Sequence, residues 1–205
     1  MALNAIMKYR TILLFGAPGS GKGTQGKILG TVPHFFHCAC GDVFRNLKPE
    51  TPLGKVFVKY SSEGRLVPDD VTVRLWEETI EASTRVGNFQ PKSDCLVLDG
   101  IPRNVSQARM LAGTLDVRAM FWLRAQEFGH LVSRLQRRAL KENRLDDANV
   151  EVIRQRLDTY EKETRPVVDF YGKKLVRRID ADKSPLEVCH SILGHIKRLG
   201  LQPSV

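Results

Sequence analysis

The sequence predicts an α/β protein with a doubly wound, five-stranded parallel sheet flanked by helices. Short, continuously apolar runs alternate with longer segments of helical period, which is typical of this fold class. Such runs suit strands that are covered on both faces, as a parallel sheet requires. The 205 residues are 42% hydrophobic and 27% charged, a composition typical of a folded globular chain. We therefore expect one core domain over residues 1–205.

Five apolar runs and seven helical patterns follow one another along the chain. We expect strands at residues 10–15, 35–38, 95–98, 119–123 and 175–179. We expect helices near residues 22–30, 52–63, 69–84, 104–113, 126–141, 149–171 and 184–198. Asp69 and Asp70, which follow Pro68, predict a helix N-terminal cap, and Asn104 predicts another.

The charge balance favours an anionic partner. Lysine and arginine number 32 against 23 aspartate and glutamate, a formal net charge of +9. Such a charge suits nucleic acid, an acidic membrane surface or a polyphosphate nucleotide, and charge alone does not distinguish them. Arginines are concentrated between residues 134 and 156, which favours forked recognition of phosphate oxygens, although a solvated helix face is the simpler alternative.

The cysteines and the N-terminal segment bear on compartment. The four cysteines show no paired CxxC spacing, so we expect buried thiols and neither a zinc site nor a disulfide framework. The first ten residues, MALNAIMKYR, carry only a short apolar patch, and no run approaches the roughly 20 apolar residues that span a bilayer. We expect a cytoplasmic protein without a membrane partner.

A glycine-rich loop, GAPGSGKGT at residues 16–24, follows the first apolar run and precedes a helical pattern. It matches GxxxxGK, with one glycine inserted before the threonine of the commonest form. Glycines let successive backbone N–H groups converge on phosphate oxygens, and the helix N-terminus adds partial positive charge. Lys22 would reach between the β- and γ-phosphates of a bound nucleotide, and the Thr24 hydroxyl would face its metal ion. The loop predicts a P-loop nucleoside-triphosphate hydrolase-like fold rather than a glycine-rich turn without a ligand.

Asp99 comes directly after the third apolar run. It is therefore expected at the carboxyl edge of the sheet, where ligands bind in open α/β folds. There it would hold Mg²⁺ directly or through water. The alternative is an exposed aspartate in a turn before Gly100.

Several segments together resemble the nucleoside monophosphate kinases, and the adenylate kinase family most closely. They are GAPGSGKGTQ (16–25), CGDVFR (40–45), EGRLVPDD (63–70), DGIPRNVSQA (99–108), RLQRR (134–138), RLDD (144–147) and RLDTYEKETRPVVDFY (156–171). The resemblance covers nearly the whole chain. It implies reversible, Mg²⁺-dependent transfer of the terminal phosphoryl group of ATP to AMP, giving two ADP and maintaining purine nucleotide balance.

The resemblance also implies roles for individual residues. Catalytic cations would be Lys22, Arg103, Arg138, Arg144 and Arg156. ATP would be bound by Gly19, Ser20, Gly21, Lys22, Gly23, Thr24, Arg134, Arg138 and Lys183. AMP would be bound by Cys40, Arg45, Arg65, Leu66, Val67, Gly100, Ile101, Pro102, Arg103, Gln107, Arg144 and Arg156. For Arg138 and Arg156 the alternative is an exposed helical charge, and for Arg144 it is a helix-end residue paired with Asp146 or Asp147. Arg137, Arg154 and Arg165 match no functional position and are interpreted as surface charges.

Three positions depart from or refine the family pattern. Cys40 stands where adenylate kinases usually have threonine and pyrimidine-nucleotide relatives alanine, so the base preference is less defined. Gln107 matches the glutamine that adenylate kinases use on adenine, which favours AMP. Ile101 replaces the customary phenylalanine, a change that we interpret as packing.

The family's two mobile parts are expected in short form. Five residues, 139–143, separate Arg138 from Arg144, too few for a zinc-bearing or β-stranded lid. We expect a brief helical lid near 137–147 and a helical AMP-binding insert near 39–68, with Mg²⁺ and no zinc. The expected partners are ATP, AMP and ADP, without nucleic acid, and the expected state is a monomer. Alternatives are a UMP/CMP or broader nucleoside monophosphate kinase, and a non-catalytic nucleotide-binding or nucleic-acid-associated protein of the same fold.

Overall fold

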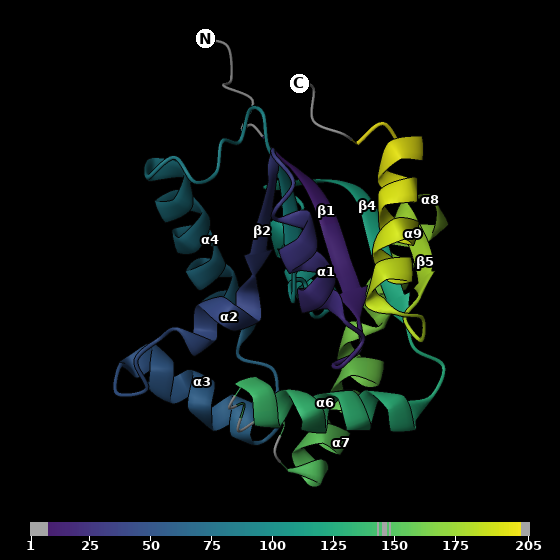
Figure 1. The fold of residues 1–205 in the computed structure, drawn as a ribbon. Coiled ribbons are helices and arrows are strands. Elements are labelled where there is room, and N and C mark those ends of the chain that lie inside the picture. Colours follow the sequence, from purple (N-terminus) through teal and green to yellow (C-terminus); the bar gives the residue numbers. More distant parts are fainter. Residues whose placement is uncertain (1–7, 143, 145–146, 148, 202–205) are drawn as a thin grey trace.

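The core of the protein is a five-stranded, all-parallel sheet, as the alternating pattern predicts (Figure 1). The computed structural model describes residues 8–142, 144, 147 and 149–201. The sheet order is β2 (Phe35–Ala39), β3 (Cys95–Asp99), β1 (Tyr9–Gly16), β4 (Leu115–Arg124) and β5 (Val176–Asp180). Because β1 lies between β3 and β4, the loop that follows it opens at the centre of the carboxyl edge.

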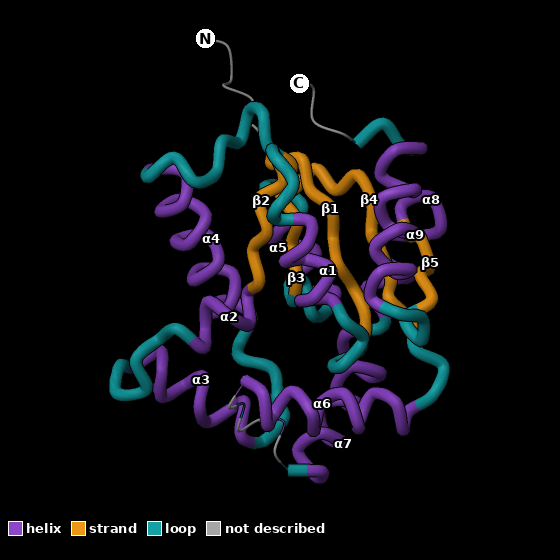
Figure 2. Tube along the Cα trace, viewed as in Figure 1, coloured by secondary structure: helices purple, strands orange, loops and turns teal. Residues whose placement is uncertain are grey.

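Alternate residues of the strands supply two apolar layers, one on each face of the sheet. Leu13 and Phe15 of β1 join the cluster that includes Trp76 of α4 (Asp69–Arg85) and residues of α5 (Val105–Leu111) and α8 (Pro166–Leu175). Ile12 and Leu14 join the opposite cluster, with residues of α1 (Lys22–Leu29) and α9 (Pro185–Arg198). Figure 2 shows helices on both sides of the strands, so the doubly wound arrangement is confirmed.

Four helices lie beyond the carboxyl edge of the sheet (Figure 1). They are α2 (Cys40–Arg45), α3 (Pro52–Ser62), α6 (Phe128–Glu142) and α7 (Val150–Thr159). Leu131 and Leu135 of α6 pack with Ile153 and Leu157 of α7 in a small apolar cluster of their own. These helices therefore face the strand ends across the space where a ligand of an α/β fold binds.

The helix expected over residues 149–171 is interrupted. After α7 comes a π-helical segment, η2 (Tyr160–Thr164), and α8 begins at Pro166. The N–H of Arg165 donates to the carbonyl oxygen of Tyr160, five residues back, at 2.8 Å. Pro166 has no N–H to continue the regular pattern, which explains why a wider turn precedes it.

A short helix and the start of one strand also differ from expectation. The short helix α2 was not predicted, because six residues give too little periodicity to recognise. Strand β4 begins at Leu115, four residues before the expected start, because Leu115 pairs with Tyr9, the first residue of β1.

The two predicted helix caps have opposite outcomes. The Asn104 side chain accepts a hydrogen bond from the N–H of Gln107 at 2.8 Å and caps α5, as predicted. The cap predicted at Asp69 and Asp70 is wrong, because α4 already begins at Asp69 and Pro68 occupies the cap position. Both carboxylates lie in the first helical turn, where they still complement the helix dipole.

Among the described residues, no helix is both long and apolar enough to cross a bilayer.

Candidate functional site

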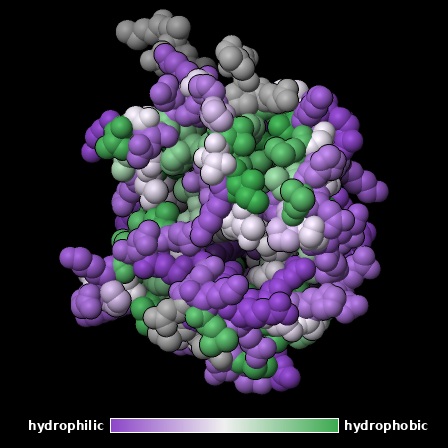
Figure 3. Space-filling view, viewed as in Figure 1, coloured by the Kyte–Doolittle hydropathy of each residue, from purple (hydrophilic) through white to green (hydrophobic). Residues whose placement is uncertain are grey.

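A cavity of about 560 Å³ lies at the carboxyl edge of the sheet, between the strand ends and the helices beyond them. Figure 3 shows a hollow bordered by hydrophilic residues on this side of the molecule. Every site residue predicted from the sequence borders the cavity. These residues are Gly19, Ser20, Gly21, Lys22, Gly23, Thr24, Cys40, Arg45, Arg65, Leu66, Val67, Asp99, Gly100, Ile101, Pro102, Arg103, Gln107, Arg134, Arg138, Arg144, Arg156 and Lys183.

The glycine loop between β1 and α1 is closely packed at its start and open at its end. Gly16 has φ +146°, and a Cβ there would lie 2.3 Å from the carbonyl oxygen of Leu123 in β4. Gly21 has φ +95°, and a Cβ there would meet nothing within 4 Å. The loop is thus anchored on the sheet, and its last residues open toward the cavity at the N-terminus of α1, where helix N–H groups have no intrahelical partner.

The Ser20 hydroxyl adds a polar group to this loop. It is buried and finds no hydrogen-bond partner among the residues that the structure describes. A buried hydroxyl without a partner is costly, and a ligand oxygen at the loop would satisfy it. This observation favours an anionic ligand over an empty glycine turn.

Lys22, the first residue of α1, folds back over the loop. Its Nζ donates to the carbonyl oxygens of Gly16 and Ala17 at 2.6 and 3.0 Å. The pKa of Lys22 is lowered from 10.5 to about 8, chiefly by burial and in smaller part by the positive charges of neighbouring arginines such as Arg103, whereas Asp99 opposes the shift. An anion beside Lys22 would favour its charged form and so raise this pKa.

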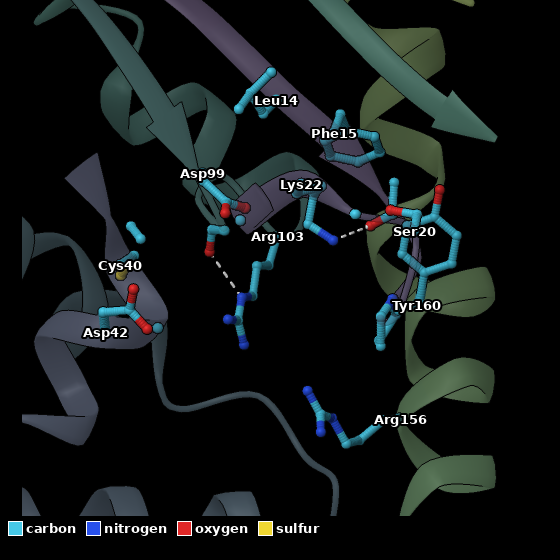
Figure 4. A pocket seen from close by; sticks show the side chains of 18 of the residues that line it. Leu14, Phe15, Ser20, Lys22, Cys40, Asp42, Asp99, Arg103, Arg156 and Tyr160 are labelled. Carbon is cyan, nitrogen blue, oxygen red and sulfur yellow. Dashed lines mark hydrogen bonds between the residues drawn. The ribbon is translucent and has the colours of Figure 1, made fainter. Parts of the chain in front are cut away.

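Arginines reach the same cavity from several elements. Arg103, in the segment between β3 and α5, is held by a hydrogen bond from its Nε to the carbonyl oxygen of Gly100 at 2.7 Å. Figure 4 shows Lys22 and Arg103 pointing into the cavity from the sheet edge, with Arg156 pointing toward them from α7. Arg138 reaches the same cavity from α6.

Asp147 joins the two helices that carry the lid arginines. Its carboxylate is fully buried and accepts from the Nε of Arg138 at 2.7 Å and from Arg156. Asp147 lies nine residues from each arginine. It therefore holds the guanidinium groups of α6 and α7 close together despite their like charge. From its sequence Asp147 was expected only as a partner of Arg144, because nothing local indicates which of several nearby arginines a buried carboxylate binds.

Arg144 lies among other charged groups at the cavity. Its Nε is 2.6 Å from a Glu142 carboxylate oxygen, and an NH2 nitrogen is 3.6 Å from Asp42, which also binds Arg45 at 2.6 Å. Burial lowers the pKa of Arg144 from its usual value, and the positive charges of Arg138 and Arg45 lower it further. Asp146, the other partner considered for Arg144, lies outside the described residues.

The charges around the cavity do not balance. Among the described residues that border it, twelve are lysine or arginine and three are aspartate or glutamate. The cations are Lys22, Lys27, Arg45, Arg65, Arg103, Arg134, Arg137, Arg138, Lys141, Arg144, Arg156 and Lys183, and the anions are Asp42, Asp99 and Glu142. Such an excess suits a ligand with several negative charges.

One edge of the cavity lies near the end of β5. Arg134 of α6 donates to the carbonyl oxygen of Ala181 at 2.7 Å, which fixes its guanidinium beside the segment that carries Lys183. Arg137, interpreted from the sequence as a surface charge, is exposed and also borders the cavity. Arg154 and Arg165 pair with Glu151 and Asp169 on their own helical segments. The position of Arg137 at the cavity was not predicted, because it depends on how α6 is oriented.

The opposite edge of the cavity contains Cys40, Asp99 and Gln107. Burial raises the pKa of Cys40 to about 11, so its thiol is neutral at physiological pH. Asp99, the last residue of β3, is only 8% exposed, which argues against the exposed turn considered as an alternative. Ile101 is 3% exposed and packs in an apolar cluster, in agreement with the packing interpretation.

The fold and the cavity define a nucleotide-binding protein of the phosphate-binding-loop class, in which a parallel sheet presents a glycine loop to a polyanion. A family model described as adenylate kinase matches residues 14–176. The chain belongs to the adenylate kinase family.

Curated relatives agree with this assignment. The chain is 34% identical to adenylate kinase 1 of a Nostoc species over 88% of this chain and 95% of the relative. It is 36% identical to the adenylate kinase of a Cyanothece species over 92% of this chain and 95% of the relative. It is 39% identical to the adenylate kinase of Porphyromonas gingivalis over 80% of this chain and 84% of the relative.

Proposed function

We propose that the protein catalyses reversible transfer of the terminal phosphoryl group of ATP to AMP, which gives two ADP. The observation that carries the proposal is the cavity itself: a glycine loop, Lys22 and a set of arginines from both sides border one space with few carboxylates. Two nucleotides that meet through their phosphates bring a large negative charge into one place, so fixed cations are the main requirement for catalysis. Membership of the adenylate kinase family supports the same activity.

The reaction needs positioning and charge neutralisation rather than proton transfer. An oxygen of the AMP phosphate forms a bond to the γ-phosphorus of ATP, while the bond from that phosphorus to the bridging oxygen of the β-phosphate breaks. Because the AMP phosphate is already ionised, no general base is required. Lys22 would neutralise the β- and γ-phosphates, and Arg138, Arg144 and Arg156 would stabilise the transferring group from the helices opposite the sheet.

The two nucleotides would occupy opposite parts of the cavity. The loop residues Gly19 to Thr24 would bind the phosphates of ATP, with Arg134 against the adenine ring and Lys183 beside it. Arg45 and Arg103 would bind the phosphate of AMP, and the remaining AMP-binding residues would surround its nucleoside. Those remaining residues are Cys40, Arg65, Leu66, Val67, Gly100, Ile101, Pro102 and Gln107.

Magnesium fits the oxygen groups beside the loop. A Cβ on Gly23 would lie 3.7 Å from Oδ2 of Asp99, so this carboxylate lies against the first turn of α1, which also carries Thr24. Mg²⁺ is usually held by one or two protein oxygen groups together with nucleotide phosphates and water. We propose that Thr24 and Asp99 hold it, Asp99 directly or through water, and that the ion neutralises phosphate charge. Among the described residues, no group of three or more His, Cys, Asp or Glu side chains is placed to hold a metal ion.

Two helical parts would close over the substrates. The insert near residues 39–68 contains α2 and α3, and the lid near 137–147 includes the end of α6. Their closure over the sheet edge would exclude water and so prevent hydrolysis of ATP. We propose that the protein works as a cytoplasmic monomer on free nucleotides, without a nucleic-acid partner.

A substrate panel and one substitution test this function. ADP formation from ATP and Mg²⁺ should be fastest with AMP in a panel that includes dAMP, CMP, UMP and GMP. Lys22→Met should retain the circular dichroism spectrum of the parent and lose phosphoryl transfer by orders of magnitude. Lys162→Met is a matched control, because Lys162 is exposed and pairs only with Asp158 among the contacts described. Near-parental activity of Lys22→Met would refute the role of the loop, and faster reaction with UMP or CMP would reassign the acceptor.

A further inference from the structure

We propose that Asp69 is a positioning residue that fixes the orientation of the Gln107 amide and thereby favours an acceptor base with an amino group over one with a carbonyl group. The inference rests on the proposed function, because it assumes that the acceptor base lies beside Gln107. Asp69 is the first residue of α4 and is not among the described residues that border the cavity. It therefore acts through Gln107 and not by touching the nucleotide.

Three side chains form a hydrogen-bonded group at this point. Oδ1 of Asp69 accepts from Nε2 of Gln107 and from Nδ2 of Asn104, both at 2.8 Å. Oε1 of Gln107 accepts from the backbone N–H of Arg103 at 2.7 Å. The oxygen of the Asn104 side chain accepts from the backbone N–H of Gln107 at 2.8 Å. Gln107 is thus held at both ends of its amide and at its backbone.

These contacts allow one orientation of the amide. An ionised carboxylate only accepts hydrogen bonds, and a backbone N–H only donates them. If the Gln107 amide turned over, its oxygen would face the carboxylate of Asp69 and its nitrogen would face the N–H of Arg103. Both contacts would be repulsive, and because Gln107 is 1% exposed, water does not replace them.

The fixed orientation leaves a defined pattern for a ligand. The amide nitrogen keeps one N–H beyond the one that Asp69 accepts, and the amide oxygen keeps one lone pair. The edge of adenine offers an amino donor next to a ring-nitrogen acceptor, which matches this pattern. Hypoxanthine has a carbonyl oxygen and a ring N–H at the same places, so it needs the amide turned over. Cytosine presents the same order of groups as adenine, so Asp69 separates amino from carbonyl bases and not purines from pyrimidines.

The test is the preference of the protein for AMP over inosine monophosphate, which differ at this edge. Asp69→Ala removes the carboxylate, so the acceptor that holds the Gln107 amide nitrogen is lost. One of the two constraints on Gln107 is then lost, and we expect the ratio of kcat/KM for AMP to that for inosine monophosphate to fall about tenfold, the value of roughly one hydrogen bond. The change should lie in KM, with kcat for AMP within about threefold of the parent.

Asp70→Ala is the matched control. Asp70 lies in the same first turn of α4 and is exposed, so its loss removes the same charge from the same helix terminus. This variant should keep the parental ratio. Should Asp69→Ala fail to fold, Asp69→Ser should lower the ratio as well, because serine suits a helix N-terminus and cannot reproduce the carboxylate contact with both amides.

A double-mutant cycle separates positioning from general destabilisation. If Asp69 acts through Gln107, Asp69→Ala should change the KM for AMP by less than twofold in a Gln107→Ala background. An equal loss for both nucleotides, or the same effect with and without Gln107, would overturn the proposal. Calorimetry measures the ratio of the affinities for AMP and inosine monophosphate in the same variants without turnover. It therefore tests the role of Asp69 even if the parent protein forms no ADP. Absence of ADP formation by the parent would contradict the proposed function and not the role of Asp69.

Discussion

The lowered pKa of Lys22 predicts that nucleotide binding takes up a proton and weakens at alkaline pH. In the free protein this pKa is about 8, chiefly because the ammonium group is buried. The phosphates of ATP would raise it toward its ordinary value of 10.5, because they favour the charged form. Binding is therefore at full strength only well below pH 8 and weakens progressively as the pH rises through the free-protein value.

The size of the effect follows from this shift. At pH 8 about half of the free protein lacks the proton, so binding should take up about 0.5 proton. Between pH 7.5 and pH 9 the affinity for ATP should fall about eightfold, because the neutral fraction at pH 9 is about 90%. Other groups contribute little in this range: burial raises the pKa of Cys38 to about 12 and that of Cys40 to about 11, and burial lowers that of His37.

Titration calorimetry measures both quantities. ATP is titrated into the protein at pH 8 in two buffers with different ionisation enthalpies, and the difference in observed heat gives the number of protons taken up. Lys22→Arg is the control, because a guanidinium stays charged at every pH used, and its affinity should vary by less than about twofold. Equal heats in the two buffers, or an affinity of the parent that does not change up to pH 9, would refute the reasoning.

Two substitutions test how the site is supported. Asp147→Asn leaves two arginines without their buried carboxylate and should lower the free energy of unfolding by about 3 kcal/mol, which is a fall in Tm of roughly 6–12 °C. The control Asp158→Asn removes an exposed helical ion pair and should change Tm by less than about 2 °C. Equal shifts in Tm would contradict the role of Asp147. Gly16→Ala places a Cβ 2.3 Å from the carbonyl oxygen of Leu123 and should destabilise the fold by about 3 kcal/mol or more. A Cβ at Gly21 meets nothing within 4 Å, so Gly21→Ala should cost about 1 kcal/mol, from backbone strain alone. Chemical denaturation measures this difference, and similar costs at the two glycines would show that contact with β4 is unimportant.

Hydrophobic patterning predicted the sheet well because its signal is local. A strand covered on both faces must be apolar along its length, so β1 and β3 were recognised from their residues alone. The π-helical segment before Pro166 and the short helix α2 were missed. Their backbone conformation depends on a few hydrogen bonds, such as that from Arg165 to Tyr160, and not on any periodic pattern.

The candidate site was also predictable only in part. The glycine loop and the family segments predicted which residues border the cavity, and the structure brings those residues together in one place, although their individual roles stay predictions. The partners of the charged groups were not predictable. Asp69 was expected to cap its own helix and instead binds Gln107, because α4 packs beside α5.

The sequence by itself determined the order of strands and helices, the anion-binding loop and the excess of positive charge, since each depends on neighbours along the chain or on composition. Only the tertiary structure decided which carboxylate holds which cation or amide: Asp147 between α6 and α7, and Asp69 behind Gln107. The physical reason is that a buried charge must be paired, but several partners of suitable chemistry lie within reach in the sequence. Packing of the helices selects among them.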